Sequence, residues 1–583
     1  MASAAALLAA TALAGWPAAA QEGAGRTATG GVGASVGGGA AAESASPGLS
    51  TPFAGGGGAP GIPSSADRPN VRVGPFLSAP FATGLSRTGE RGGPNARSYD
   101  YSAGMTLGTF YSNTSGGGQG GSRNELGLFA TPFVRVTADT ARVQGSFSFA
   151  PSFIANTQDT QPSRVTTSFF GTGTAEIIPG SVFVDARGAA FLQPLVPGAT
   201  LGTTLPGTRS PALQQNYIFA LSPYWVQRYG DLANSIVGYQ LQYNAVPGSS
   251  VLFQPNGTTV NNNPGDTLGQ NFYASLRSGE RFGRLGMEAR VNATFFSGGG
   301  PVNDGARNII YAFDTRYAIT RTVVLLGEIG YQQSRFGGFP GFRYDGITWG
   351  GGVRLDPSEN STIIAILRSR DGFVSPVVDL RTQLGPRTVV FGRYAEIVGN
   401  ALGQGTALLN SVGVDAAGNP VSLATGAPQP QVGGSGFLGT TGGLSRNRIG
   451  TASITRFLQR DSLSLQYFYS ERIPLSASQG QIPFRQTNNT VSATWSRPFT
   501  DFTSGFASVG YTWTLSTQLS VPSESFTASA GISQRFGRRL TGSLVYQFSH
   551  RTQGSFNPIG PLGSTLTSDQ TQNTVLGSLS LQF

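Results

Sequence analysis

The sequence contains no cysteine, and its 39 basic residues are all arginine, because no lysine occurs anywhere in the chain. Without cysteine the protein has no disulfide, no thiolate nucleophile and no thiolate metal ligand. His550 is the single histidine. Zinc and haem sites usually draw on several histidine or cysteine ligands, so we expect no metal site and no cofactor.

Long apolar runs are missing after the first residues. The longest resemble Val323–Leu326, far below the roughly 18 residues that a membrane-spanning helix needs. The N-terminal segment Met1–Ala20 is the exception, since it is apolar and ends in small residues before Gln21, as a signal peptide does. No arginine precedes its apolar part, which departs from the usual pattern. We therefore expect residues 1–20 to direct export.

Residues 21–97 are rich in glycine, alanine, serine and proline, for example Gly55–Gly58. A segment of this composition buries too little apolar surface to offset the entropy cost of ordering it. We expect residues 21–97 to be a flexible periplasmic leader.

From Ser98 the pattern changes to strict alternation, which is typical of strands with two different faces. Between Leu285 and Phe295, apolar residues occupy one set of alternate positions, and Glu288, Arg290, Asn292 and Thr294 occupy the other. Such segments are about ten residues long, whereas strands of soluble β-sandwiches average about five or six. In hydrocarbon, strands can span only as a closed barrel, because every backbone polar group must be paired. The alternation therefore predicts an all-β fold: one large transmembrane antiparallel up-and-down β-barrel over residues 98–583.

The lengths of the connections also support a barrel, and their alternation allows its strands to be counted. Outer-membrane barrels alternate short periplasmic turns with longer extracellular loops. Counting back from Phe583, short connections recur at every second position, and long ones such as 399–444 lie between them. Residues 371–375 are short where a long loop is expected. The count predicts about 22 strands, with 18 or 20 if weak strands merge. It also predicts that both termini of the chain face the periplasm.

The last strand alternates through Val575, Gly577, Leu579 and Leu581 and ends at Phe583. This ending resembles the signal by which the barrel assembly machinery recognises its substrates, so we expect that machinery to be a partner. Aromatic residues near the expected strand ends could form the girdles that contact outer-membrane lipid and lipopolysaccharide. They are Tyr229, Phe282, Tyr317, Phe457, Phe499, Phe536 and Trp513.

We find no pattern that indicates an enzyme. His550 follows Ser549, but it continues the alternation of Leu544, Tyr546 and Phe548, which places it on the lipid side. No phosphate-binding or calcium-binding loop motif is present. The net charge of +10 could suggest nucleic acid, yet the arginines are scattered singly without a basic stripe, so we expect no nucleic-acid partner.

Charged residues in the middle strands fall on the face opposite the apolar positions. Charges on the lipid face are costly, so these side chains are expected to line the lumen. They are Glu288, Arg290, Asp314, Arg316, Glu328, Arg354, Arg368, Arg370, Asp379, Arg381 and Arg393. Arginine outnumbers acid among them, and guanidinium groups recognise carboxylates and phosphates. We expect Arg368, Arg370, Arg381 and Arg393 to form a continuous ladder that favours anions.

Three segments of the C-terminal third carry a resemblance to a known family: Ser470-Glu471-Arg472, Arg535–Phe548 and Asn573–Phe583. In the spacing of their strands and turns they resemble a family of bacterial outer-membrane β-barrels associated with exopolysaccharide and PEP-CTERM (exosortase) systems. The resemblance implies an outer-membrane pore that exports an exopolysaccharide, with periplasmic polysaccharide-export proteins as partners, and the excess of arginine in the lumen favours an acidic polymer. A general or substrate-specific diffusion porin is the second hypothesis. A structural or adhesive surface barrel is the third.

Overall fold

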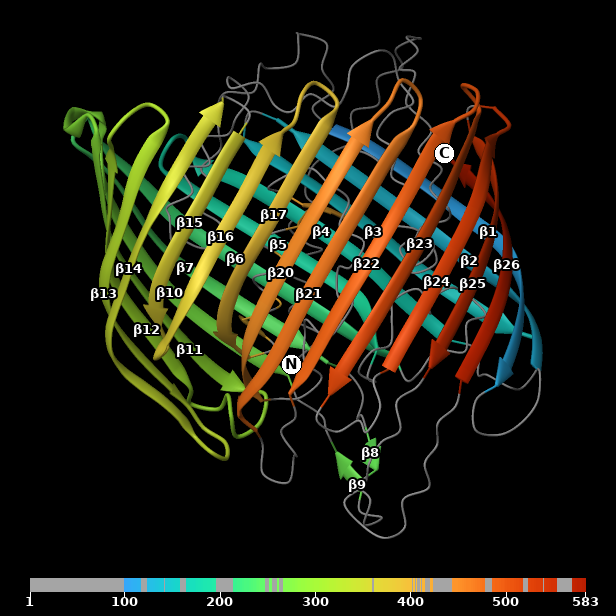
Figure 1. Cartoon of the computed structure of the whole chain (residues 1–583), viewed down its shortest axis with the longest axis horizontal. Helices are drawn as coiled ribbons and strands as arrows, with labels where there is room; N and C mark the ends of the chain where they lie inside the picture. The colour runs from blue at the N-terminus through green and yellow to red at the C-terminus, as the bar shows by residue number, and fades with distance from the viewer. Residues whose placement is uncertain are drawn as a thin grey trace.

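The computed structural model describes most of the chain from Tyr99 onward (Figure 1). The described residues are 99–116, 123–140, 142–157, 164–194, 213–246, 251–253, 259–261, 266–358, 361–400, 402–403, 405, 409, 412–414, 420–422, 443–477, 485–516, 523–537, 539–552 and 569–583. The expected signal peptide (1–20) and leader (21–97) lie outside these residues. Among the residues described, no helix is both long and apolar enough to cross a membrane.

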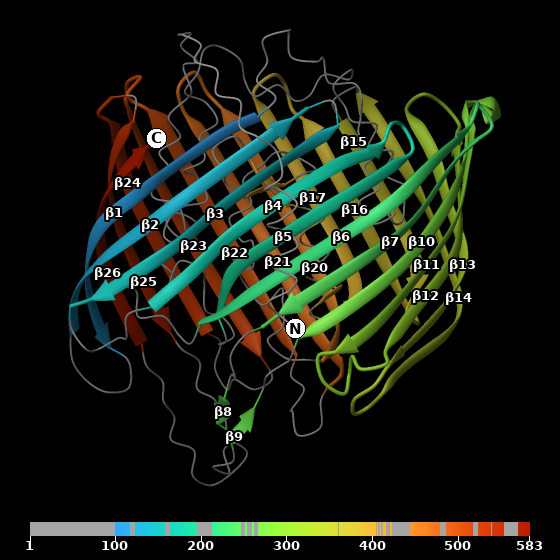
Figure 2. The same cartoon turned by 180° about the vertical axis from the view of Figure 1, so that it is seen from behind.

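Twenty-two antiparallel strands form one closed sheet. Each strand pairs with the barrel strand before and after it in sequence, and β1 pairs with β26 from Gly104 opposite Gln582 to Gly116 opposite Gln570. The sheet therefore has no free edge. Figure 1 shows the wall that contains β15–β25, and Figure 2 shows β1–β7 on the opposite wall. The expectation of an antiparallel up-and-down barrel with about 22 strands is confirmed.

The bounds of the barrel strands are as follows: β1 (Tyr99–Gly116), β2 (Arg123–Asp139), β3 (Val143–Asn156), β4 (Arg164–Ile178), β5 (Val182–Pro194), β6 (Leu213–Tyr229), β7 (Ala233–Ala245), β10 (Thr267–Ser278), β11 (Leu285–Gly298), β12 (Arg307–Ala318), β13 (Val323–Phe336), β14 (Phe342–Ser358), β15 (Ser361–Arg370), β16 (Phe373–Gln383), β17 (Thr388–Gly399), β20 (Leu444–Phe457), β21 (Ser462–Ser476), β22 (Gln486–Pro498), β23 (Thr503–Ser516), β24 (Ser523–Arg535), β25 (Leu540–Thr552) and β26 (Asp569–Gln582). The connections hold the short hairpins β8 (Val251–Phe253) with β9 (Thr259–Asn261) and β18 (Val412–Val414) with β19 (Pro420–Ser422), and one turn of 3-10 helix, η2 (Glu280–Phe282).

The two ends of the barrel differ in the length of their connections. At the end that holds Phe583, the connections range from two residues (359–360) to six (279–284). At the other end they range from two residues (371–372) to the 44 residues between β17 and β20 (400–443). Since outer-membrane barrels place short turns in the periplasm, the Phe583 end is the periplasmic end.

Side chains alternate between a lipid-facing and a lumen-facing surface along each strand. On β11, Leu285, Val291 and Phe295 are exposed on the outside of the barrel, whereas the side chain of Arg290 on the other face is only 9% exposed. The same alternation repeats around the sheet, for example at exposed Ile329 on β13 and Leu544 on β25. The outer surface is thus a belt of apolar side chains, as a membrane-spanning barrel requires.

Exposed aromatic side chains gather at the periplasmic ends of the strands. Tyr229, Phe282, Tyr317, Phe499 and Phe536 are all exposed at or beside the short connections. This arrangement fits an aromatic girdle at the membrane interface.

The other two aromatic residues expected near strand ends, Phe457 and Trp513, are not part of this periplasmic group. Phe457 was misplaced by the sequence analysis: it alternates with the exposed Ile454, so it lies on the inner face of β20. Trp513 lies toward the extracellular end of β23 and packs against Tyr511 with 5.7 Å between ring centroids.

Inside the barrel, phenylalanine rings lie over glycines of the neighbouring strand. Phe110 on β1 is opposite Gly127 on β2, and Phe129 on β2 is opposite Gly108 on β1. A Cβ atom added to either glycine would overlap the facing ring. The missing side chains therefore let both rings lie flat against the wall. Together with Ile154, Phe506, Val545 and Leu576, these rings form a buried apolar strip that the sequence analysis did not anticipate.

Phe583 completes the pairing of the last strand with the first. Its amide donates a hydrogen bond to the carbonyl oxygen of Ala103 at 2.7 Å, while its side chain is 70% exposed. The side chain is therefore available for recognition and contributes little packing to the finished barrel.

Deletion of Phe583 should lower the amount of assembled barrel in the outer membrane much more than it lowers the stability of the barrel that does assemble. One hydrogen bond, worth about 1 kcal/mol, is lost from the folded state. Assembly is measured as the band that migrates differently before and after boiling on SDS gels, with Phe583→Tyr as the control that keeps an aromatic end. Normal assembly of the deletion would show that this residue is not used as a signal.

Candidate functional site in the barrel lumen

The lumen is lined mainly by small polar side chains that hydrogen-bond across strands. Examples are Thr106 Oγ1 to Ser580 Oγ at 3.0 Å and Thr131 Oγ1 to Ser152 Oγ at 3.0 Å. Cross-strand hydroxyl pairs of this kind stabilise a sheet face that does not touch lipid. The charged residues stand out against this polar background, and most of them belong to β11–β17.

Four charged side chains form an ion-paired belt across β11–β15. Arg290 Nε lies 2.7 Å from Asp314 Oδ2, and Arg290 Nη2 lies 3.5 Å from Glu328 Oε1. Arg370 Nη2 lies 3.0 Å from the same Glu328 oxygen. Glu328 therefore joins two arginines, and its side chain is only 2% exposed. In this belt the positive and negative charges balance.

This belt includes a contact across β14. The register places Gly350 between Glu328 on β13 and Arg368 on β15. The side chain of Arg370 on β15 reaches over β14 to Glu328 on β13. The neighbouring position, Thr348, is fully buried on the same face.

The other expected lumen residues follow the same register. Glu288 stands opposite Asp314, and Arg368 donates from Nη2 to the carbonyl oxygen of Glu396 at 3.3 Å. Asp379 stands opposite Arg393 at the junction of β16 and β17. Arg381 stands opposite Thr362 on β15, nearer the periplasmic end.

The expected arginine ladder is not continuous. Arg368 and Arg370 lie near the extracellular end of β15, whereas Arg381 lies near the periplasmic end of β16. No two of the four arginines face each other in the register, because Arg368 pairs with Ser375 and Arg393 pairs with Asp379. Alternation gave the face of each arginine, but it carries no information about height along neighbouring strands.

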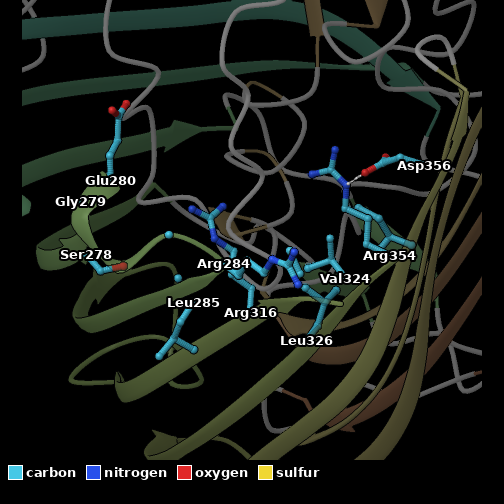
Figure 3. A pocket seen from close by; sticks show the side chains of 14 residues that line it. Ser278, Gly279, Glu280, Arg284, Leu285, Arg316, Val324, Leu326, Arg354 and Asp356 are labelled. Carbon is cyan, nitrogen blue, oxygen red and sulfur yellow. Dashed lines mark hydrogen bonds and ion pairs between the residues drawn. The ribbon is translucent and has the colours of Figure 1, made fainter. Parts of the chain in front are cut away.

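Three arginines instead meet in a pocket at the periplasmic end (Figure 3). Arg284, Arg316 and Arg354 line a cavity of about 380 Å³, together with Glu280 and Asp356. Arg354 Nε binds Asp356 Oδ2 at 2.9 Å. The apolar side chains of Leu285, Val324, Leu326 and Ile364 complete the lining.

Gly286 gives Arg316 its room in this pocket. The two residues are opposite each other on β11 and β12, and a Cβ atom on Gly286 would overlap the Arg316 side chain. The guanidinium group therefore lies across β11 instead of projecting straight into the lumen. The pocket holds three arginines against two acids, so its field favours an anion.

A segment after β17 crosses the lumen. Asn400 donates from Nδ2 to Asn303 Oδ1 at 2.8 Å, and Arg187 Nη1 on β5 donates to the carbonyl oxygen of Leu409 at 3.0 Å. Leu402 and Leu409 are fully buried, and a Cβ on Gly269 of β10 would be 2.7 Å from Leu402 Cδ2. β17 is on the front wall in Figure 1 and β5 is on the opposite wall in Figure 2, so the described residue Leu409, which follows β17 in sequence, contacts the wall opposite to that strand.

Sequence reasoning missed this inner segment and some charged residues of the lumen. It treated residues 399–444 as one extracellular loop, although the buried Leu402 and Leu409 are apolar residues within a glycine-rich stretch. It also missed Arg187 and Arg277, which alternate correctly on β5 and β10 and could have been found by extending the period of each strand. No group of three or more histidine, aspartate or glutamate side chains among the described residues is arranged to hold a metal ion.

Glu328→Gln should make the channel more anion-selective. The substitution removes the negative charge that Arg290 and Arg370 share, so Arg370 loses this carboxylate and Arg290 keeps only Asp314, which leaves the belt with a net positive charge. Selectivity is measured as the reversal potential of the purified barrel in planar bilayers under a salt gradient. Glu524→Gln makes the same charge change on an outward-facing position of β24 and should leave the reversal potential unchanged. Equal shifts in both variants would contradict the placement of Glu328 in the permeation path.

The barrel is similar to several solved outer-membrane structures. OccAB4 of Acinetobacter baumannii shares 8% identity over 83% of this chain and 98% of that chain, with a TM-score of 0.29. A mutant of the ferric enterobactin receptor PfeA of Pseudomonas aeruginosa shares 12% identity over 82% and 80%, with a TM-score of 0.38. OccK2 of Pseudomonas aeruginosa shares 8% identity over 83% and 98%, with a TM-score of 0.31. No family model and no curated protein matches the chain.

Because all three TM-scores lie below 0.5, the fold assignment rests on the strand pairing of the chain itself. The closed sheet, the apolar outer belt and the aromatic girdle together are the form in which strands cross a bilayer. The chain is a bacterial outer-membrane β-barrel.

Proposed function

We propose that this barrel is an outer-membrane channel for small hydrophilic anions. The observation that carries the proposal is the segment after β17, which crosses the lumen and is hydrogen-bonded to the opposite wall through Leu409 and Arg187. A segment in this position narrows the path and limits the size of the solute that passes. No catalytic role and no cofactor form part of the proposal.

The charge distribution supports an anion as the solute. The belt around Glu328 is balanced, whereas at the periplasmic end Arg284, Arg316, Arg354 and Arg381 outnumber Glu280 and Asp356. Guanidinium groups in a wet lumen bind anions weakly, at about 1 kcal/mol or less per contact, which permits passage instead of capture.

Export of an acidic exopolysaccharide is the second candidate, because it is what the resemblance of the C-terminal third implies. The same arginines would suit a polyanion. A polymer chain, however, occupies the whole length of the pore for as long as it is being exported, so the segment that holds Leu402 and Leu409 would have to be displaced. Periplasmic polysaccharide-export proteins are proposed partners only under this hypothesis. Outer-membrane lipid, lipopolysaccharide and the barrel assembly machinery are proposed partners in either case.

The double variant Arg187→Ala, Asn303→Ala should raise single-channel conductance and admit larger solutes. It removes the hydrogen bonds to Leu409 and Asn400, each worth about 1 kcal/mol, and so favours displacement of the crossing segment. Conductance in planar bilayers and swelling of proteoliposomes in sugars of increasing size are the measurements. Arg142→Ala, which changes an exposed arginine in a periplasmic turn, is the control. Unchanged conductance of the double variant would mean that the segment does not limit the pore, and absence of any conductance would favour a structural or adhesive barrel.

Deletion of the gene separates the two transport hypotheses. We expect the mutant to secrete normal amounts of polysaccharide and to take up a small anion such as succinate more slowly than the parent strain. Polymer in the medium is measured by uronic acid assay, and uptake is measured with labelled succinate. Loss of secreted polymer with normal succinate uptake would replace the diffusion hypothesis with the export hypothesis.

A further inference from the structure

The junction of β16 and β17 has the fewest residue pairs of any junction in the barrel wall. Only six residue pairs join these strands, from Val378 opposite Tyr394 to Gln383 opposite Val389. The extracellular half of β16, residues 373–377, pairs fully with β15, and residues 395–399 of β17 pair fully with β20. These two halves do not pair with each other. The wall is therefore split along its extracellular half.

Proline explains where the pairing stops. Continuing the register beyond Val378 would place Pro376 opposite Glu396. Proline has no amide hydrogen, so it cannot donate to the facing strand. The carbonyl oxygen of Glu396 instead accepts a hydrogen bond from Arg368 Nη2, which reaches it from β15 at 3.3 Å. An arginine side chain thus replaces a backbone donor at the split.

In the extracellular half of the wall, the unpaired edges of β16 and β17 overlap. Arg446 shares its face of the β17–β20 sheet with the outward-facing Ile454, and Phe373 shares its face with the inward-facing Ser375. Even so, the Arg446 guanidinium lies 4.3 Å from the centroid of the Phe373 ring. Val398, on the same face as Arg446, packs against a cluster that contains the inward-facing Phe336. The outer face of upper β17–β20 therefore lies against the inner face of β13–β16.

The split is bounded at the extracellular rim. The tip of the β13–β14 hairpin reaches past the short β15–β16 hairpin, and Phe339 donates its amide hydrogen to the carbonyl oxygen of Ala477 at 2.8 Å. Ser476 Oγ donates to the carbonyl oxygen of Gly337 at 2.7 Å. The overlapped region is therefore enclosed between this brace and the six residue pairs below it.

The two sides of the split differ in chemistry. On the outside of β15 and β16, Leu367 is 48% exposed and Val374 is 53% exposed, so apolar side chains face outward at this edge. On the other side, Glu396, Arg446, Arg448, Glu471 and Arg485 form an ion-paired group with one more arginine than acid. An apolar edge thus adjoins a net positive one.

We propose that the β16–β17 split is a lateral portal through which an amphiphile with an anionic head group passes between the lumen and the outer leaflet. The apolar tail lies along Leu367 and Val374, and the head group contacts Arg446, Arg448 and Arg485. The portal opens by separation of the six residue pairs on its periplasmic side, beginning at Val378 and Tyr394. This route is distinct from the axial path of the proposed hydrophilic anion channel.

A disulfide tests the portal cleanly, because the chain has no native cysteine. Val378→Cys with Tyr394→Cys joins the last paired residues of the junction, and Ile329→Cys with Trp349→Cys joins an equivalent outward-facing pair on β13 and β14 as the control. The assay uses cells that lack their own fatty-acid channel and measures uptake of dodecanoate and of succinate before and after oxidation. Oxidation at the β16–β17 junction should reduce dodecanoate uptake to the level of cells without the barrel, with recovery on reduction and no change for succinate.

Unchanged dodecanoate uptake with the disulfide formed would overturn the portal, and so would equal loss of both uptakes, since there would then be no separate lateral route. A fall in succinate uptake alone would contradict the channel proposal and the portal together. If oxidation blocks dodecanoate uptake as expected but the protein takes up no succinate at all, only the channel proposal is contradicted.

Two further variants act on the same junction in opposite directions. Pro376→Val restores an amide donor opposite Glu396 and should decrease dodecanoate uptake, whereas Arg368→Ala removes the bridging guanidinium and should increase it. Arg387→Ala, in the periplasmic turn at the other end of the β16–β17 hairpin, is the control and should change neither uptake. Effects of the same sign in the first two variants would show that disturbance of the fold, and not closure of the portal, is being measured.

Discussion

The structure depends on one constraint: within hydrocarbon, each backbone N–H and C=O group must find a partner inside the protein. The pairing of β1 with β26 meets this constraint, because it removes the two free edges that an open sheet of 22 strands would leave. Closure also fixes the two faces of every strand. One face then meets lipid and the other meets the lumen, so the apolar belt and the polar interior follow from the same pairing.

This constraint explains why the fold could be predicted from the sequence in such detail. The period of two along segments such as Leu285–Phe295 records which side chains meet lipid, and the alternation of short and long connections records the direction of each strand. Both signals are local, so they need no knowledge of long-range contacts. The strand count and the position of the periplasmic end follow from them directly.

The contacts between side chains in the lumen were harder to predict from the sequence. They depend on the position of each residue along the barrel axis and on the register between neighbouring strands. Alternation places Arg368, Arg370, Arg381 and Arg393 on one face, but only the structure shows that Arg370 on β15 reaches Glu328 on β13 across β14. A glycine has a similar effect elsewhere in the wall. Gly286 lets Arg316 lie across β11 instead of extending into the pore. A glycine in an alternating sequence does not show this effect until the facing residue is known.

At the β16–β17 junction a proline, and not a glycine, determines the geometry. Pro376 ends the pairing, and the arginine side chains of Arg368 and Arg446 cover the edges that remain. A guanidinium group can satisfy a backbone carbonyl, but its long side chain has several rotatable bonds and can leave its partner, whereas a backbone donor is held in place by the strand. A wall closed by side chains is therefore easier to open than a wall closed by a continuous ladder. At the β16–β17 junction, the backbone carbonyl of Glu396 is met by a side chain that can move, and that difference is what makes the junction suited to transport through the wall.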